Sequence, residues 1–198
     1  MIILGRLSLY GTHAARLHDE IVPIAAQWSD PQRRTAPLKP YAAVTEARTL
    51  DLLETSISGP RAANVPTVVQ DALLATVSRD VSELLPSLEA RANDVARIAI
   101  EKLARRGEQE SRDMMLILES QRKQITTTLG KVDGLQLSFE WTDEEKLQLE
   151  NDKRHWQRRL IDLQHELETE PARIRASYDV KATRIEPVGV VYLWPVSG

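Results

Sequence analysis

The stretch LENDKRHWQRRLIDLQHELETEPARI, residues 149–174, carries the clearest structural pattern in the chain. Its apolar residues recur at spacings of three and four, the heptad spacing of a helix that packs against another helix. They are Leu149, Trp156, Leu160, Leu163, Leu167 and Ile174, with Lys153 and Glu170 as polar interruptions. Thr142 and Glu145 match a capping box, so the helix is expected to begin there. Pro171 is expected to bend its last part.

A second helical pattern precedes this stretch. From Thr67 the chain is expected to be helical for about 60 residues, with Pro86 dividing the run and the later helix ending near Leu129. Within it, residues 104–113 carry almost no apolar side chain and are expected to be exposed. Gly130–Gly134 is expected to reverse the chain. Both apolar stripes are then buried most simply if the two helices form an antiparallel hairpin.

The two ends of the chain have different patterns. Residues 2–10 are rich in Ile and Leu and predict a short strand, and a helix is expected from Thr12 to about Trp28. A shorter helix is expected around residues 47–57. The β-rich tail, residues 181–194, is expected to pair with the first strand, with a bulge or bend at Pro187–Gly189.

The predicted fold is therefore mainly α. A long, coiled-coil-like hairpin stands on a small helical base, and the N- and C-terminal strands form a minor β-sheet. Three regions follow from this reading: an N-terminal strand and short helices over 1–65, a helical region with the hairpin at about 95–170 over 66–178, and a C-terminal β tail returning to the base over 179–198.

Composition restricts the class of protein. Of 198 residues, 42% are hydrophobic but only 5% are aromatic, which favours Leu- and Ala-rich helices over a β-sandwich. A net charge of −3 excludes a globally basic nucleic-acid binder, though not a local basic face. The absence of cysteine excludes disulfides, Cys-ligated zinc and a Cys nucleophile. No apolar run approaches the length of a membrane span, and no signal peptide is evident, so a cytoplasmic protein is expected.

No group of residues predicts catalysis or a cofactor. His155 and His165 are ten residues apart on one helix, about 15 Å, which is too far to share a metal ion. His13 and His18 lie at a poor spacing for a metal pair. The acidic pair Glu144–Glu145 opens a helix, where carboxylates complement the helix dipole. No phosphate-binding loop and no nucleophile motif occurs. The chain is therefore expected to be no enzyme, with no cofactor and no metal.

Basic residues are the most suggestive feature. They gather before and after the polar stretch and again on the last helix: Arg97, Lys102, Arg105, Arg106, Arg112, Arg122, Lys123, Lys153, Arg154, Arg158 and Arg159. If the arms pair, the adjacent guanidinium groups of Arg105, Arg106, Arg158 and Arg159 are the best candidates for contact with DNA phosphates. The alternative is a solvated helical face, because acidic residues are interleaved with the basic ones.

The predicted hairpin tip offers a second candidate site. Leu137, Phe139 and Trp141 lie close together there and form a candidate partner-docking patch. The alternative is that these side chains pack back onto their own hairpin.

Three stretches resemble a known family. They are EARTLDLLE (46–54), RRGEQESRDMMLILESQRKQI (105–125) and, above all, residues 150–198, in which a W…RRL…EL…EP…I…Y series precedes RIEPVGVVYLWP. Together they resemble the C-terminal region of bacterial SNF2-type helicases, especially the helicase component of DISARM-like phage-defence systems.

The resemblance implies an accessory role. Those helicases move on duplex DNA with two RecA-like lobes, but the Walker lysine and the DEAH-box acids have no matching positions here, so no catalytic residue carries over. The chain looks like a separately encoded piece, an excised domain or part of a split gene. Its implied partners are the SNF2-type motor or another defence subunit, and duplex DNA bound without sequence preference. The alternative is a protein-interaction coiled coil with no nucleic-acid role.

Overall fold

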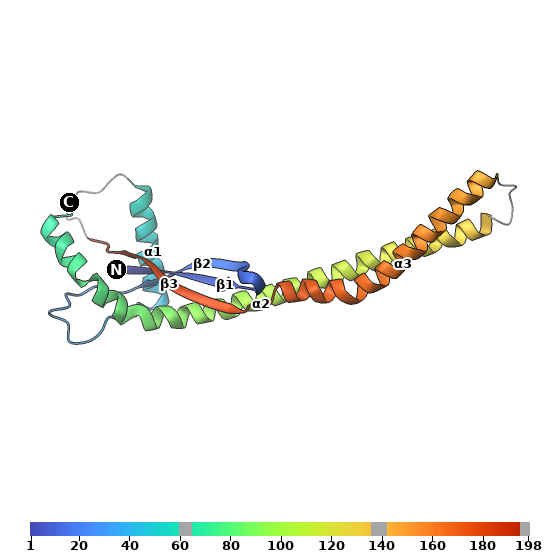
Figure 1. The fold of residues 1–198 in the computed structure, drawn as a ribbon. Coiled ribbons are helices and arrows are strands. Elements are labelled where there is room, and N and C mark those ends of the chain that lie inside the picture. Colours follow the sequence, from blue (N-terminus) through green and yellow to red (C-terminus); the bar gives the residue numbers. More distant parts are fainter. Residues whose placement is uncertain (60–64, 136–141, 195–198) are drawn as a thin grey trace. The chain divides into compact units, whose positions relative to one another are not determined.

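The computed structural model describes residues 1–59, 65–135 and 142–194. Its elements in chain order are β1 (Ile2–Tyr10), the 3-10 turn η1 (Thr12–Ala14), β2 (Arg16–Ala25), α1 (Ala43–Ser58), α2 (Thr67–Leu135), α3 (Asp143–Ser177) and β3 (Ala182–Val191) (Figure 1). The prediction of a mainly helical fold with a small sheet from the two ends of the chain is confirmed. A helix over about 47–57 is also confirmed, as part of α1.

The chain divides into two compact units. Residues 1–100 and 180–198 form the first, called the sheet unit here. Residues 101–179 form the second, called the helical unit. α2 contributes its first part to the sheet unit and its remainder to the helical unit.

In the sheet unit, β1 is the central strand of the order β2-β1-β3, and both its partners run antiparallel to it. Ile2, Ile3, Leu7 and Leu9 are completely buried because a central strand is covered on both edges and here on both faces. The predicted bulge is confirmed. Leu4 pairs with Gly189 and Gly5 with Pro187, which leaves one extra residue in β3 between them.

The predicted helix from Thr12 to Trp28 is wrong. β2 occupies most of that stretch and forms a hairpin with β1, turning through His13 and Ala14 at φ values of 55° and 56°. The helical spacing of Leu17, Ile21 and Ile24 is overridden because β1 gains a full set of ladder hydrogen bonds from this partner. Pro23 is tolerated since β2 is an outer strand, where the missing N–H is not needed by a neighbour.

The outer edge of β2 is closed by an ion pair from two helices. Ala25 N donates to Glu46 Oε1 of α1 at 2.9 Å, and Arg91 Nη1 of α2 donates to the carbonyl oxygen of Pro23 at 2.8 Å. Arg91 Nη1 also lies 2.5 Å from Glu46 Oε2. The buried Glu46 thus satisfies the edge group that another strand would otherwise use.

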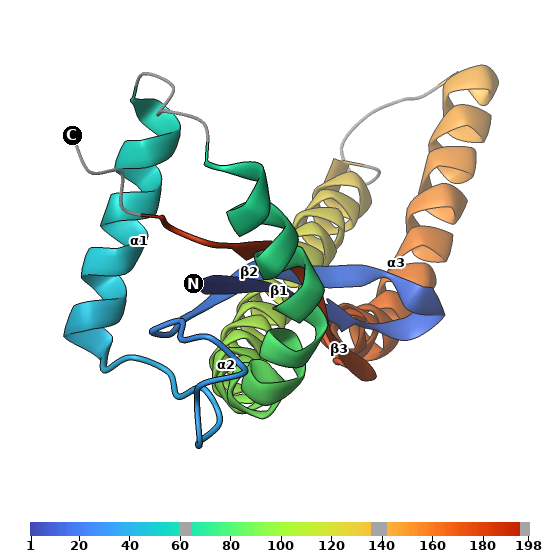
Figure 2. The same ribbon diagram turned by 90° about the vertical axis from the view of Figure 1, so that its left-hand side faces the viewer.

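α2 is unbroken from Thr67 to Leu135, so the predictions that Pro86 divides it and that Gly130–Gly134 reverses the chain are wrong. Pro86 is exposed, while Leu84 and Leu88 on either side are fully buried, and this packing keeps the chain helical despite the missing hydrogen bond. Leu88 lies against Gly5 of β1, where an added Cβ would stand 2.8 Å from its methyl groups. Figure 2 shows this part of α2 alongside the sheet.

In the helical unit, α3 begins with the predicted capping box, which is confirmed. The helix continues through Pro171 to Ser177. Its buried Leu163 packs with Leu118 and Ile125 of α2, surrounded by Met114, Leu129, Trp156, Leu160 and Leu167. The polar stretch 104–113 is mostly exposed as expected, but Ser111 is buried and donates to the carbonyl oxygen of Pro171 at 2.9 Å.

Candidate functional site

The four arginines predicted to contact DNA all lie in the helical unit, and two of them are engaged by neighbouring acids. Arg106 pairs with Glu110 at 2.8 Å, and its guanidinium lies 5.7 Å from the centre of the Tyr178 ring. Tyr178 OH also donates to Glu110 at 2.6 Å. Hydrogen bonds from Tyr178 and then Arg106 lower the pKa of Glu110, so this acid stays ionised beside the arginine.

Arg159 is held in the same way. Its Nη1 and Nη2 donate to the two carboxylate oxygens of Glu166 at 2.5 and 3.1 Å, and Nη2 lies 3.4 Å from Gln121 Oε1 of α2. The hydrogen bonds from Arg159 lower the pKa of Glu166. The charge of Arg159 is therefore largely balanced within the protein.

Arg105 and Arg158 differ from their neighbours. Both are exposed, and among the described residues neither takes part in an ion pair. The structure also separates the two predicted clusters. Arg106 and Gln121, the residue that Arg159 meets, are fifteen positions apart in α2, which is about 22 Å along the helix. The four arginines thus form two clusters and not one continuous surface.

Two further basic residues of α2 resemble Arg105 and Arg158 in having no ion pair among the described residues. Arg112 and Lys123 are exposed and, within the described ranges, have no acidic partner. Arg105, Arg112 and Lys123 follow one another at seven and eleven residues, close to two and three full turns, so they share one outward face of the helix. These three residues define the cationic face. Their spacing is visible in the sequence, but only the structure shows that they have no acidic partner among the described residues.

A groove lies between α2 and α3 in the same unit. It has a volume of about 470 Å³, within the usual range of ligand sites. Its walls are Gln121, Gln124, Ile125 and Thr128 of α2 and His155, Trp156 and Arg159 of α3. None of these described wall residues carries a carboxylate. The rings of His155 and Trp156 meet edge to face with centroids 5.3 Å apart.

The predicted docking residues Leu137, Phe139 and Trp141 lie outside the described residues.

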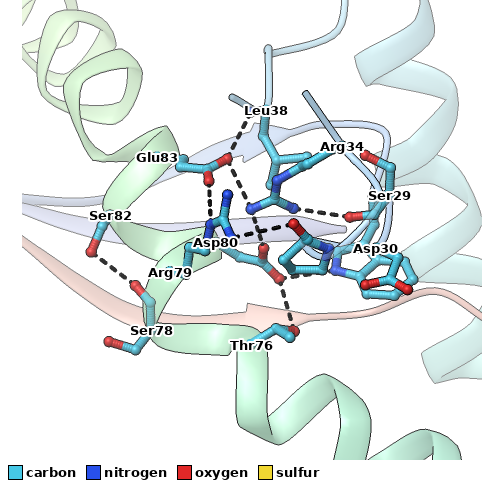
Figure 3. Close-up of polar contacts among 12 residues, drawn as sticks. Ser29, Asp30, Arg34, Leu38, Thr76, Ser78, Arg79, Asp80, Ser82 and Glu83 are labelled. Carbon is cyan, nitrogen blue, oxygen red and sulfur yellow. Dashed lines mark hydrogen bonds and ion pairs between the residues drawn. The ribbon is translucent and has the colours of Figure 1, made fainter. Parts of the chain in front are cut away.

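Sequence reasoning missed a buried polar network in the sheet unit, centred on Asp80 of α2 (Figure 3). Asp80 is fully buried. Its Oδ1 accepts from Arg34 Nη2 at 2.8 Å, and its Oδ2 accepts from Trp28 Nε1 at 2.9 Å and from Tyr192 OH at 2.7 Å. Burial and the charge of Asp80 raise the pKa of Tyr192. A single carboxylate thereby joins the loop after β2, the helix α2 and the segment after β3.

Glu83, one turn further along α2, completes this network. It accepts from Arg34, from the backbone N–H of Leu38 at 2.9 Å and from Arg79 at 2.9 Å. Burial alone would raise the pKa of Glu83, but these hydrogen bonds and the charge of Arg34 lower it to about 2. Because both carboxylates are occupied by protein donors, the network is suited to holding segments together and not to proton transfer. Only the tertiary contact identifies it, since its members are scattered along the chain.

The described histidines do not form a metal site. His18 lies 2.9 Å from Glu20, and the ring of His155 meets that of Trp156 edge to face. Within the described part of the chain, no group of three or more His, Asp or Glu side chains is placed to hold a metal ion. The described helices also include none with the length and apolar character needed to cross a bilayer.

Comparison with known proteins identifies no relative. No family model matches the chain, and neither the curated proteins nor the solved structures contain a significant match.

Proposed function

We propose that this chain is a non-catalytic accessory module of an SNF2-type helicase, acting in bacterial anti-phage defence. In this proposal a long antiparallel helical hairpin positions DNA, or a partner subunit, relative to the motor. The sequence resemblance is the basis for the proposed helicase family, and the helical unit contains the surface proposed to contact DNA. The observation that carries the proposal is the cationic face, together with the free Arg158 on α3, because none of these four side chains is neutralised by an acid of the described chain.

Contacts in the helical unit support the hairpin. Glu108 meets Arg175, Ser111 meets Pro171, and Arg122 meets Gln164, so rising positions in α2 match falling positions in α3. This order is what two antiparallel helices produce. The heptad-spaced Trp156, Leu160, Leu163 and Leu167 all belong to the shared apolar cluster, as a coiled-coil seam requires.

Unpaired cations on a helix surface suit the phosphate backbone of duplex DNA. Arginine forms two parallel hydrogen bonds to phosphate, and each phosphate contact releases bound counterions. The cationic face carries no base-reading pattern, so contact is sequence-independent in this proposal. The overall charge of −3 makes the binding weak and strongly dependent on salt.

A second candidate is a protein-interaction module with no nucleic-acid role. Met115, Leu116 and Ile117 are consecutive on α2 and are 40%, 64% and 53% exposed, and Ile161 of α3 is 71% exposed. Large apolar side chains exposed in such a run are typical of a surface that a partner covers.

DNA binding by the whole chain at several salt concentrations tests the proposal. A variant with Gln at Arg105, Arg112, Lys123 and Arg158 is expected to bind duplex DNA at least tenfold more weakly. Its salt dependence should be shallower by about 0.9 per lost phosphate contact. The matched control places Gln at Arg33, Arg154, Arg173 and Arg184, which are exposed but ion-paired, and should bind like wild type.

The control makes the result specific, since both variants lose four positive charges. Equal loss in both would mean that only net charge matters and would refute the cationic face. A wild-type chain that binds no duplex DNA even at low salt would leave the protein-interaction module as the function. ATP hydrolysis is expected from neither variant nor wild type.

A further inference from the structure

We infer that the groove between α2 and α3 holds an unpaired base of single-stranded nucleic acid. This inference rests on the nucleic-acid contact proposed above and adds the form of nucleic acid that the helical unit prefers. The groove has a volume of about 470 Å³, which has room for one base and its sugar.

Aromatic surface is the first requirement of a base-binding site. The described residues of α2 and α3 include one Trp, Trp156, and it lines this groove with His155 beside it. His155 is exposed, while Trp156 is half-buried against the apolar cluster and so held in place. Every base has a π-face, so stacking on such side chains is largely independent of sequence.

Hydrogen-bonding capacity is the second requirement. Gln124 projects an amide into the groove that bonds to no other described side chain, and Gln121 uses only its Oε1, towards Arg159. Amide groups can both donate and accept hydrogen bonds, and the edges of bases carry both donors and acceptors. In a duplex those edges are already paired and the faces already stacked, so a base could enter only from a single strand.

The charges around the groove fit a polyanion. Among the described wall residues there is no carboxylate, and Arg159, a cation in the wall, is fixed in orientation by its ion pair with Glu166. The next residue, Arg158, is exposed and unpaired among the described residues, so it is available for the phosphate next to a bound base. The groove therefore combines stacking, amide hydrogen bonds and a neighbouring phosphate contact.

Comparing a fluorescent oligothymidine with a duplex of equal length tests the inference on the full chain at low salt. Wild type is expected to bind the single strand about tenfold more tightly, the gain that one stacked base supplies. The double variant Gln124→Glu with His155→Ala should lose that preference and leave duplex binding within about twofold of wild type. Both positions lie on the groove wall away from the buried cluster, so the helices should be retained.

The matched control is Gln148→Glu with His165→Ala. These two exposed residues of α3 lie outside the groove, and the charge change is the same. It should behave like wild type. In addition, 5-iododeoxyuridine in the oligonucleotide should crosslink on irradiation to Trp156, as located by mass spectrometry of the digested protein.

The outcomes separate this inference from the function proposed above. Duplex binding without single-strand preference, or equal loss in both double variants, would overturn the groove alone and leave the cationic face standing. Binding to neither form would overturn both. If the groove variant instead altered self-association in sedimentation experiments and left nucleic-acid binding unchanged, a second copy of the chain would cover the groove and the inference would be wrong.

Discussion

The sheet unit and the helical unit use their polar side chains in different ways. In the sheet unit, Asp80 and Glu83 are surrounded by donors, and the Tyr192–Asp80 hydrogen bond joins residues 112 positions apart. In the helical unit, the buried contact is an apolar cluster around Leu163, and most charged side chains face outward. A charged side chain that is already paired within the protein is not available to bind a ligand. The exposed charges of the helical unit are therefore the ones that remain available to a ligand.

The comparison predicts that the two units respond to different kinds of mutation. The sheet unit should be sensitive to the loss of one charged group, because its partners would be left buried and unsatisfied. The helical unit should be sensitive to the loss of apolar volume.

The largest effect is expected from Asp80→Ala. This change leaves Arg34, whose side chain is 5% exposed, without one of its two acidic partners. It also removes the hydrogen-bond acceptor of Trp28 Nε1 and Tyr192 OH. Removing one member of a buried ion pair costs about 3–5 kcal/mol of unfolding free energy. Urea denaturation followed by circular dichroism measures it. Asp71→Ala, at an exposed position of the same helix, is the control and should cost less than about 0.5 kcal/mol. Equal costs would show that the network adds no stability.

Leu163→Ala should have the next largest effect, in the helical unit. Leu163 is fully buried between Leu118 and Ile125, and a cavity of this kind costs about 3 kcal/mol. Ile161→Ala is the control, since Ile161 is 71% exposed on the same helix. Hydrogen exchange should accelerate at amides of α3 and of residues 101–135 while the sheet amides stay protected. Faster exchange throughout the sheet would mean that the two units unfold as one.

The smallest effect concerns pH. The pKa of Glu83 is lowered from 4.5 to about 2, so its ionised form stabilises the fold above pH 4.5, and that contribution is lost as the pH falls towards 2. Glu83→Gln cannot ionise and should flatten the pH dependence of stability across this window. Thermal melting at a series of pH values measures the slope. Glu89→Gln, exposed on the same helix, should keep the wild-type slope, and an unchanged slope in both variants would refute the role of Glu83.

Several parts of the fold were predictable from local pattern. The strand Ile2–Tyr10, the tail that pairs with it, the bulge near Pro187 and the capping box at Thr142 each follow from a few neighbouring residues. The candidate site was predictable in part. Basic clusters are visible in the sequence, but whether each arginine is paired depends on acids such as Glu166, seven residues from Arg159.

The failures occur where long-range contacts outweigh local propensity. Residues 16–25 have a helical spacing, yet they form β2 because β1 offers a complete hydrogen-bonding edge. Pro86 and Gly130 are weak helix positions, yet α2 passes through both. Propensities amount to about 1–3 kcal/mol per residue, which packing on both sides of a proline can offset.

By itself the sequence determined that the protein is mainly helical, that its two ends meet in a small sheet, and where its basic residues gather. These properties depend on periodicity and on residue type, which are local. Only the tertiary structure decided that β2 is a strand, that Asp80 is buried among Trp28, Arg34 and Tyr192, and that Arg105 and Arg158 remain unpaired while Arg106 and Arg159 do not. Each of these depends on which distant residues a side chain meets, because the free energy of a buried charge is set by its neighbours in space.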